Sequence, residues 1–419
     1  MSIPFVFESQ SILYKFGADK VMLRAGKVLG IAAGFLLFLQ IVFSARLKIL
    51  DQIFALDRLH FFHRLNAVFI TTLILLHPVF VLAPEGLTNF SFDLRSWPEM
   101  VGACLLALLF SITVTGLWRL KFKLSFDRWL FFHRLATTAA VALLVLHVLF
   151  VSDTFKQGIP RVSVFLACGL YFLLLTWMKV KPRLLKKKPW LVSGVTKLAA
   201  DAFSVELTPA EKTKFSYFPG QFAFLSFASQ NISAEEHPFT ISSSPTRPMN
   251  VSFTVRCCGD WTWDIGRVKA GDSAFVDGPY GRFSYLRDKS CEIIMIAGGI
   301  GITPMLSMLR HMADTGEDKR VTMIWSNQTR QHVIYEDELN RLQERLPLFR
   351  LLYFFTRESA AGVGGGRLDQ VQLQGSLENC NRQAAVFLCG PPPMIRDMRR
   401  CLPKLGFAKR KIHWEKFSL

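Results

Sequence analysis

The chain has 419 residues, of which 51% are hydrophobic, and a formal net charge of +18 at pH 7. This length allows two or three domains, and a mean hydropathy of +0.28 is high for a soluble protein. The basic residues flank apolar runs and form no basic helix suited to a groove. This pattern excludes nucleic acid as a partner and favours anchoring to lipid headgroups. The eight cysteines contain no CxxC pair, which argues against a disulfide framework and against zinc.

The long apolar runs are confined to the first 180 residues, and each is long enough to cross the hydrocarbon core of a bilayer. We predict spans at 25–44, 59–82, 99–118, 129–151 and 161–178. Residues 1–24 alternate apolar and polar side chains, which predicts a short helix lying on the membrane surface. They lack the apolar core and cleavage site of a signal peptide. A sixth span within residues 1–20 is the alternative.

The distribution of basic residues predicts the topology of the spans. Loops 45–58 and 119–128 and the segment after residue 178 are rich in Lys and Arg, so they are expected to be cytoplasmic. Loops 83–98 and 152–160 are poor in basic residues and are expected outside. The sequence therefore predicts an integral membrane protein with its soluble domains in the cytoplasm. We expect the membrane to be a bacterial inner membrane.

Two of the predicted spans open with nearly the same motif, at 57–65 and 127–135. Each motif contains a histidine two residues before its end, and a second histidine follows fourteen residues later. Fourteen residues make nearly four helical turns, so both side chains lie on the same face of the helix. The four histidines are His63, His77, His133 and His147. Each helix then carries two imidazoles on one face, about 21 Å apart. Two such helices side by side predict two b-type hemes, each held axially by two imidazoles. The alternative is that these histidines pair with polar neighbours, but buried polar groups in lipid are costly and usually functional.

In this topology His63 and His133 share the inner level, and His77 and His147 share the outer level. Arg64 and Arg134 each follow an inner histidine, and we expect them to pair with heme propionates. His60 has no counterpart in the second motif, because Leu130 takes its place. We interpret His60 as a neighbour of the ligands or an alternative ligand.

The pattern changes after a basic linker at 179–190. Short β-rich runs separated by turn residues predict a small antiparallel β-barrel. These runs are 191–195, 202–207, 222–227, 251–256 and 274–276. From residue 291, strands alternate with helical stretches, which predicts a Rossmann-like α/β domain. The expected domains are 1–180 in the membrane, 181–288 for the barrel and 289–419 for the α/β fold.

Motifs in the barrel half together predict an FAD site. Phe239 can stack on the isoalloxazine, and Thr240 and Ser242 can hydrogen-bond to flavin or ribityl atoms. Arg256 and Thr262 can meet the pyrophosphate. The complete set of expected FAD contacts is His237, Pro238, Phe239, Thr240, Ser242, Arg256, Trp261 and Thr262.

The α/β half predicts a nucleotide site, because its first strand runs into a glycine-rich turn and then a helix. Glycines let the backbone approach a pyrophosphate, and the helix N-terminus offers amide donors. A Cys-Gly-Pro sequence follows the last apolar strand, at the sheet edge where ligands bind. Taken alone, a cysteine at position 389 would more often be a small buried residue than a ligand contact. The expected contacts are Gly298, Gly299, Gly301, Thr303, Pro304, Cys389, Gly390 and Pro391.

These motifs carry a family resemblance. The C-terminal half resembles the ferredoxin–NADP reductase family, and nearly all of 20–419 resembles the NADPH oxidase and ferric reductase superfamily. The most specific stretches are 237–243, 259–262 and 298–304, together with the paired histidine helices. The resemblance implies that cytoplasmic NADPH reduces FAD and that electrons cross two b-type hemes to an outer acceptor. Molecular oxygen, giving superoxide, is the first expectation. A ferric-chelate reductase and a cytochrome carrier serving another protein are the alternatives, and no regulatory subunit or domain is evident.

The resemblance also assigns individual residues and reveals two departures. Arg24 is similar to an oxidase arginine near the outer heme. Cys389 and Phe417 are expected beside the reacting nicotinamide and flavin, although Phe417 could serve core packing instead. The eukaryotic oxidases usually have six spans. They also carry a further histidine where this chain has Val81.

The end of the second α/β strand predicts the choice of pyridine nucleotide. An acidic residue there favours NADH, whereas arginine favours the 2′-phosphate of NADPH. Strand 321–325 is followed by Ser326 and Arg330, and no acid occurs until Glu336. Arg357 follows the next strand and could reach the same corner. The sequence therefore predicts NADPH, unless both arginines are solvated surface charges.

Overall fold

The computed structural model describes residues 17–85, 93, 96–119, 121–151, 155, 158–184, 189–211, 215–358 and 364–416. The chain divides into two compact units, Met1–Leu185 and Lys186–Leu419. The surface helix predicted within residues 1–24 lies mostly outside the described residues. Its last part instead opens the first long helix of the membrane unit.

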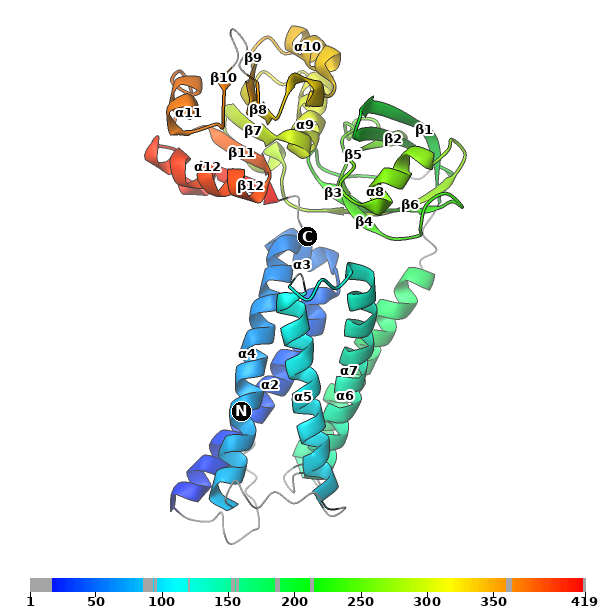
Figure 1. Ribbon diagram of the computed structural model, residues 1–419, viewed down its shortest axis with the longest axis vertical. Coiled ribbons are helices and arrows are strands. Elements are labelled where there is room, and N and C mark those ends of the chain that lie inside the picture. The colour runs from blue at the N-terminus through cyan, green and yellow to red at the C-terminus, as the bar shows by residue number, and fades with distance from the viewer. Residues whose placement is uncertain are drawn as a thin grey trace. The chain divides into compact units, whose positions relative to one another are not determined.

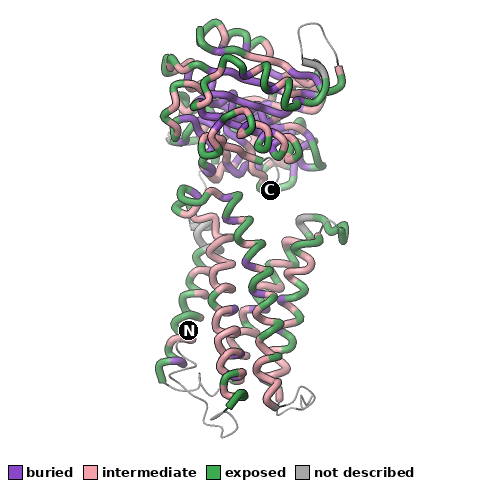
Figure 2. Tube along the Cα trace, turned by 90° about the vertical axis from the view of Figure 1, so that its left-hand side faces the viewer, coloured by how far each residue is buried: buried purple, intermediate pink, exposed green. Residues whose placement is uncertain are grey.

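The N-terminal unit is helical (Figure 1). Its helices are α2 (Gly17–Ser44), α3 (Lys48–Phe54), α4 (Leu56–Leu82), α5 (Trp97–Trp118), α6 (Phe126–Val151) and α7 (Gly158–Leu184). α2 packs along α4, and α5 packs along α6, so the unit contains two similar helix pairs. A small apolar core of Leu105, Leu109 and Ala140 of the second pair joins them, because Leu37 of α2 and Ile74 of α4 pack against it. Most other apolar side chains of these helices are exposed or half-buried (Figure 2), as expected of helices surrounded by lipid.

Four helices among the described residues are long and apolar enough to cross a membrane. They are α2, α4, α5 and residues Arg128–Val151 of α6. The prediction of five or six spans is therefore corrected to four. The fifth predicted run lies in α7, whose apolar part is the shorter stretch Gly158–Leu174. α7 then continues to Leu184 through residues assigned to a linker, where Lys179, Lys181 and Arg183 end the apolar character.

The C-terminal unit begins with a six-stranded antiparallel sheet in the order β4-β3-β6-β1-β2-β5. The strands are β1 (Trp190–Ala199), β2 (Ala202–Pro209), β3 (Phe222–Ala228), β4 (His237–Thr240), β5 (Val251–Arg256) and β6 (Ser273–Tyr280). The described strands do not close into the predicted antiparallel β-barrel. The two edges of the sheet approach each other just past β4, where the described residues form a single bridge between Ile241 and Phe253. One apolar core, including Val205, Leu225 and Phe253, fills this half.

The second sheet is parallel, with the order β10-β9-β8-β7-β11-β12. Its strands are β7 (Glu292–Gly298), β8 (Arg320–Asn327), β9 (Phe349–Phe355), β10 (Gly364–Gly365), β11 (Ala385–Gly390) and β12 (Ile412–Lys416). The sequence predicts strands at 293–297, 321–325, 351–355 and 385–388, which correspond to β7, β8, β9 and β11. β10 and β12 were missed because the first is two residues long and the second is half polar.

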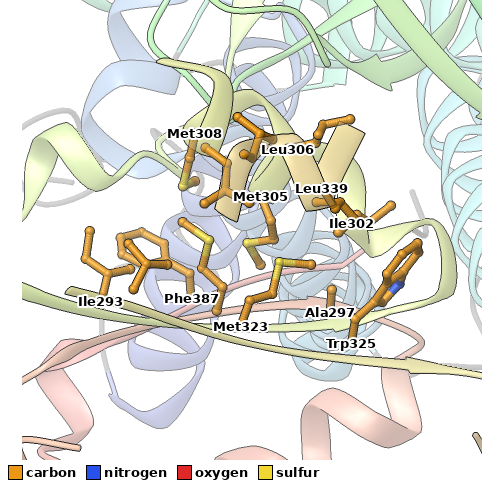
Figure 3. Packing of buried hydrophobic residues seen from close by; sticks show 14 of the residues in the cluster. Ile293, Ala297, Ile302, Met305, Leu306, Met308, Met323, Trp325, Leu339 and Phe387 are labelled. Carbon is orange, nitrogen blue, oxygen red and sulfur yellow. The ribbon is translucent and has the colours of Figure 1, made fainter. Parts of the chain in front are cut away.

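Helices cover both faces of this sheet. They are α9 (Ile302–Thr315), α10 (Glu336–Arg345), α11 (Gln370–Ser376) and α12 (Pro392–Lys404). On one face Met323, Trp325 and Phe387 pack beneath α9 and α10 (Figure 3). On the other face Ile294 and Ile324 pack with Leu373 and Leu402 of α11 and α12. Because neighbouring parallel strands all end at one sheet edge, the loops after β7, β8 and β11 meet there.

Candidate functional site

The four predicted histidines form two pairs across α4 and α6. The ring centroids of His63 and His133 are 6.4 Å apart, and those of His77 and His147 are 6.3 Å apart. Two imidazoles bound to opposite sides of one metal would have centroids about 6.3 Å apart, since a ring nitrogen lies roughly 1.1 Å from its centroid and metal–imidazole bonds are about 2.0–2.1 Å. Both pairs therefore fit axial ligation of one iron each.

Backbone carbonyls orient three of these four rings. The Nδ1 atom of His77 lies 2.8 Å from the Gly26 carbonyl, and that of His147 lies 3.1 Å from the Pro98 carbonyl. His63 Nδ1 lies 3.1 Å from the carbonyl of Gln40. A carbonyl can only accept a hydrogen bond, so each Nδ1 must donate the proton. The Nε2 lone pair is then available to a metal, which is the tautomer that metal-binding histidines adopt.

Glycines that were not predicted as site residues make room for the His77 and His147 rings. A Cβ atom built on Gly30 of α2 would lie 2.9 Å from Cε1 of His77, and one built on Gly102 of α5 would lie 2.5 Å from Cε1 of His147. Each glycine follows the residue with the carbonyl acceptor by four positions. The two helix pairs therefore repeat the same arrangement of a carbonyl acceptor and a glycine around a histidine ring. A signal was present in the Gly26-x-x-x-Gly30-x-x-x-Gly34 spacing, a pattern that lets membrane helices approach closely.

The His63–His133 level is less symmetric. Gln40 makes two contacts at this level. Its carbonyl faces His63, and its side-chain oxygen accepts a hydrogen bond from Asn66 Nδ2 at 3.0 Å. The buried Nδ1 of His133 has no hydrogen-bond partner among the described residues. Its ring instead packs on the indole of Trp129, with centroids 4.9 Å apart and planes inclined by 33°. The motif position of Trp129 is held by Leu59 in the first copy.

The predicted arginines lie near these levels. Arg24 precedes Gly26, whose carbonyl binds His77, by two residues on α2. Arg64 and Arg134 are exposed and directly follow His63 and His133. Their positions in the chain fit the predicted pairing with an anionic group at each level.

The predicted flavin residues cluster at β4 and the segment after β5. The Trp261 indole stacks on Phe239 with centroids 5.8 Å apart and planes 14° apart, and it also contacts the His237 ring at 4.2 Å. Its Nε1 donates to the Ser233 carbonyl. Trp261 therefore supports both the His237 and the Phe239 rings of β4, which Pro238 separates in the sequence.

Hydroxyl groups at this site have different surroundings. Thr240 is buried, and its Oγ1 has no hydrogen-bond partner among the described residues, which suits a ligand contact. Ser242 is engaged in the protein, since its hydroxyl donates to the Ser252 carbonyl and accepts from Thr254. The Thr262 hydroxyl accepts from the backbone amides of Cys258 and Gly259, so it shapes the loop. We therefore assign loop shaping to Thr262 in addition to its predicted pyrophosphate contact.

The two halves of this unit meet along a polar seam that the sequence did not reveal. Arg310 of α9 forms a two-point ion pair with Glu338, with both N–O distances at 2.7 Å, and donates to the Ser242 carbonyl. Ser307 of α9 donates to the Ser243 carbonyl. Tyr335 bonds to Thr254 of β5. These contacts join the flavin half to the α/β half within one compact unit.

The glycine-rich turn lies at the carboxyl edge of the parallel sheet, as predicted. β7 ends at Gly298, and residues Gly299–Gly301 form a 3-10 turn before α9. A Cβ atom on Gly301 would overlap the Cys389 carbonyl, and one on Gly390 would lie 3.0 Å from the Gly298 amide nitrogen. The ends of β7 and β11 therefore touch through their backbones. Thr303 and Pro304 are buried in the first turn of α9.

Cys389 is fully buried at the end of β11. Burial, and then the nearby Glu415 carboxylate, raise the pKa of its thiol well above the usual value. The thiol therefore stays protonated at neutral pH and cannot act as a nucleophile. Its place beside the turn suits packing against a nicotinamide. Pro391 follows Gly390 and precedes α12. Phe417 lies outside the described residues.

The predicted 2′-phosphate corner contains carboxylates as well as arginines. Ser326 is opposite Gly298 in the β7–β8 register. Arg330 pairs with Glu336, with Nη2 and Oε1 2.7 Å apart, and its backbone amide donates to Glu358. The backbone amide of Arg357 donates to the Gln328 carbonyl, so the loops after β8 and β9 lie together.

Solved structures and curated proteins resemble the C-terminal unit. The flavohem-like FAD/NAD-binding domain of nitric oxide dioxygenase from Vibrio cholerae O1 biovar El Tor matches with a TM-score of 0.50 and 22% identity, over 55% of this chain and 98% of that one. The reductase component of propane 2-monooxygenase from Rhodococcus jostii is 28% identical over 242 residues, which are 54% of this chain and 62% of that protein. NADH-cytochrome b5 reductase 1 from Mortierella alpina is 36% identical over 147 residues, 35% of this chain and 49% of that protein. The chain thus spans about half to two thirds of these curated relatives.

Three family models match successive parts of the chain. Residues 29–151 match the ferric reductase like transmembrane component, which includes all four histidines of the pairs. Residues 190–284 match an FAD-binding domain, and 295–400 match the oxidoreductase NAD-binding domain. The chain therefore has the domain architecture of the NADPH oxidase and ferric reductase-like superfamily, with a ferric reductase-like membrane component followed by FAD-binding and NAD-binding domains of the ferredoxin–NADP reductase type.

Proposed function

We propose that this protein is a transmembrane NADPH oxidase that moves electrons from cytoplasmic NADPH to molecular oxygen on the other side of the membrane. The overall reaction converts NADPH and two O₂ into NADP⁺, a proton and two superoxide ions. Bound FAD would accept the hydride and release its electrons singly, and two b-type hemes would carry them across the membrane. In this proposal the soluble domains lie in the cytoplasm of a bacterial cell, on the side of the NADPH that they would oxidise.

The observation that carries this proposal is the pair of His–His contacts across α4 and α6. Both separations fit an iron held between two imidazoles, and the Nδ1 bonds of His63, His77 and His147 leave Nε2 for the metal. Two such pairs at different depths would hold two redox groups, which would supply electron transfer along the membrane normal. Because each iron would have two protein ligands, the acceptor would take its electron at the edge of the heme.

The soluble unit supplies the matching donor site. Phe239 and Thr240 would hold the flavin ring system, while the turn after β7 would approach the pyrophosphate of the pyridine nucleotide. The buried, protonated Cys389 would pack beside the nicotinamide without reacting. No side chain needs to act as acid, base or nucleophile in hydride transfer. The chain's part is to set distance, orientation and exclusion of water.

A ferric-chelate reductase is the second candidate, and Val81 favours it. The resemblance to oxidases implies a histidine at this position, near the site where oxygen is reduced. Here the side chain of Val81 packs against α2, where a Cβ atom on Gly26 would lie 2.6 Å from Val81 Cγ2. An apolar contact at this position removes one donor that would stabilise reduced oxygen.

The test uses the purified full chain in lipid nanodiscs with NADPH, FAD and heme. An oxidase reduces cytochrome c in a reaction that superoxide dismutase abolishes, and it consumes oxygen in step with NADPH. The His77→Ala variant should lose this activity, whereas His60→Ala, which changes an imidazole outside both pairs, should keep it. Anaerobic reduction of ferric citrate at the same rate, without superoxide in air, would establish the reductase instead.

A further inference from the structure

Arg256 lies where the flavin half meets the glycine-rich turn. It is the last residue of β5, paired with Ala202 in the antiparallel sheet. Its Nε lies 3.3 Å from Oδ2 of Asp201 in the flavin half, and its Nη2 donates to the His332 carbonyl in the α/β half at 3.2 Å. The side chain is 19% exposed, so this cation is largely withdrawn from water.

The third neighbour of the guanidinium is the turn itself. A Cβ atom built on Gly299 would lie 2.9 Å from Nη1 of Arg256, closer than real Cβ contacts allow. Among the described residues, Arg256 is the one contact within 4 Å of that position. Gly299 has a φ of +54°, so the turn also uses the backbone freedom of glycine. The absence of a side chain at Gly299 therefore lets the turn close onto a residue of the flavin half.

The guanidinium retains hydrogen-bonding capacity in this position. Its buried Nε faces the Asp201 carboxylate, and among the described residues its Nη groups make one hydrogen bond, from Nη2 to the His332 carbonyl. A guanidinium carries five N–H donors in a planar fork that matches phosphate oxygens. Bonds from Arg256 to a diphosphate would thus add to, and not require loss of, its contact with His332.

We infer that Arg256 is a binding residue shared by the two nucleotides, and that Gly299 is a positioning residue for FAD although it belongs to the pyridine-nucleotide turn. This inference rests on the assignment of the flavin site to FAD. One cation serves the flavin pyrophosphate and forms the edge of the turn that receives the second pyrophosphate. A side chain at Gly299 would push the guanidinium away from Asp201 and His332. A change in the α/β half would therefore weaken FAD binding in the flavin half.

The experiment measures the FAD dissociation constant of the deflavinated full chain by flavin fluorescence quenching, without pyridine nucleotide. We expect Gly299→Ala and Arg256→Lys each to weaken FAD binding by about ten- to a hundredfold, the factor for loss of one charge-assisted hydrogen bond. The double variant should be little weaker than either single variant, because both changes act on one contact.

Gly316→Ala is the matched control. Gly316 also has a left-handed φ, +68°, but it lies at the other end of α9 with open space around its Cα. It carries the same backbone strain without touching Arg256, so its FAD affinity should stay at the wild-type value. Circular dichroism of all variants separates loss of the site from loss of the fold.

Two results would overturn the inference. One is Gly299→Ala binding FAD as the wild type does while its NADPH affinity falls, and the other is full additivity in the double variant. A wild-type chain that binds no FAD would instead refute the flavin assignment itself, so the two failures are distinguishable.

Discussion

The indole of Trp129 lies against the imidazole of His133, with ring centroids 4.9 Å apart, at the one histidine of the four whose Nδ1 lacks a carbonyl partner among the described residues. The ring of His133 is therefore oriented by packing where the other three rings are oriented by hydrogen bonds. A hydrogen bond donated by Nδ1–H raises the basicity of a ligating imidazole. We expect the two ligands of the His63–His133 pair to be electronically unequal.

Replacing Trp129 by leucine, the residue at the matching position of the first motif, tests this packing role. An aromatic pair contributes about 0.5–1.5 kcal/mol beyond its buried area. Trp129→Leu should therefore keep both hemes but release one of them about two- to tenfold faster. Heme transfer to apomyoglobin measures the rate, and low-temperature electron paramagnetic resonance should show a shift in one of two low-spin signals. Unchanged spectra and release rates would assign Trp129 to the lipid interface alone.

Removal of single histidines tests the ligand assignment. His77→Ala and His147→Ala should each lose the same heme, and His63→Ala and His133→Ala the other. His60→Ala should retain both, because His60 belongs to neither ring pair. The pyridine hemochrome assay gives the heme content. Full heme content in His77→Ala would contradict the assignment of the His77–His147 pair.

Gly30 allows a second test that leaves every ligand in place. A methyl group there would press on His77, whereas Gly34, one turn later on the same helix, has open space around it. Ala has a higher helix propensity than Gly by about 0.8–1.0 kcal/mol, so neither change should unfold α2. We expect Gly30→Ala to lower occupancy of one heme and Gly34→Ala to leave both in place. Equal heme content in the two variants would show that the His77 ring can move without loss.

The sequence predicts those features that depend on local spacing. The fourteen-residue interval gave both histidine pairs, and the strand–glycine–helix order gave the turn at Gly298. Other features depend on which helices or sheets become neighbours, and periodicity carries no such information. The Gly26 carbonyl and the Arg310–Glu338 ion pair belong to this class. The number of spans was overestimated because α7 is long, while its apolar stretch ends before the lysines at its C-terminus.

Asp288 provides a pH-dependent test of how β12 is held. Partial burial alone would raise the pKa of this carboxyl, but hydrogen bonds from Lys411, Ser290 and His413 outweigh that effect and hold it well below the usual value. A carboxyl whose pKa is lower in the folded chain stabilises it above its unfolded pKa of about 3.9, and this contribution is lost as the pH falls below that value.

Asp288→Asn should therefore lower the thermal unfolding midpoint at pH 7, with a loss of about 1.5–3 kcal/mol for hydrogen bonds to a charged group. The difference from wild type should shrink as the pH is lowered below about 4. Asp397→Asn is the control, because Asp397 pairs with Arg367 at an exposed position and such pairs contribute little. A pH-independent difference would mean that Asp288 acts through packing and not through its charge.

The choice of pyridine nucleotide depends on whether a 2′-phosphate can displace a carboxylate from Arg330. In this structure Glu336 holds the guanidinium at 2.7 Å, and both side chains are partly exposed, so the ion pair is weak and open to competition. A phosphate carries more charge and can bind the arginine fork at two points.

We expect Arg330→Ala and Arg357→Ala to raise the KM for NADPH about ten- to a hundredfold and to leave the KM for NADH nearly unchanged. The factor corresponds to the roughly 1.5–3 kcal/mol of a hydrogen bond to a charged group. Glu336→Gln should lower the KM for NADPH, because it removes the competing charge. Arg350→Ala is the control, since Arg350 lies near the opposite, amino end of β9 and should alter neither constant. Equal use of NADH and NADPH by the wild type, or equal loss of both in Arg330→Ala, would show that this corner does not bind the 2′-phosphate.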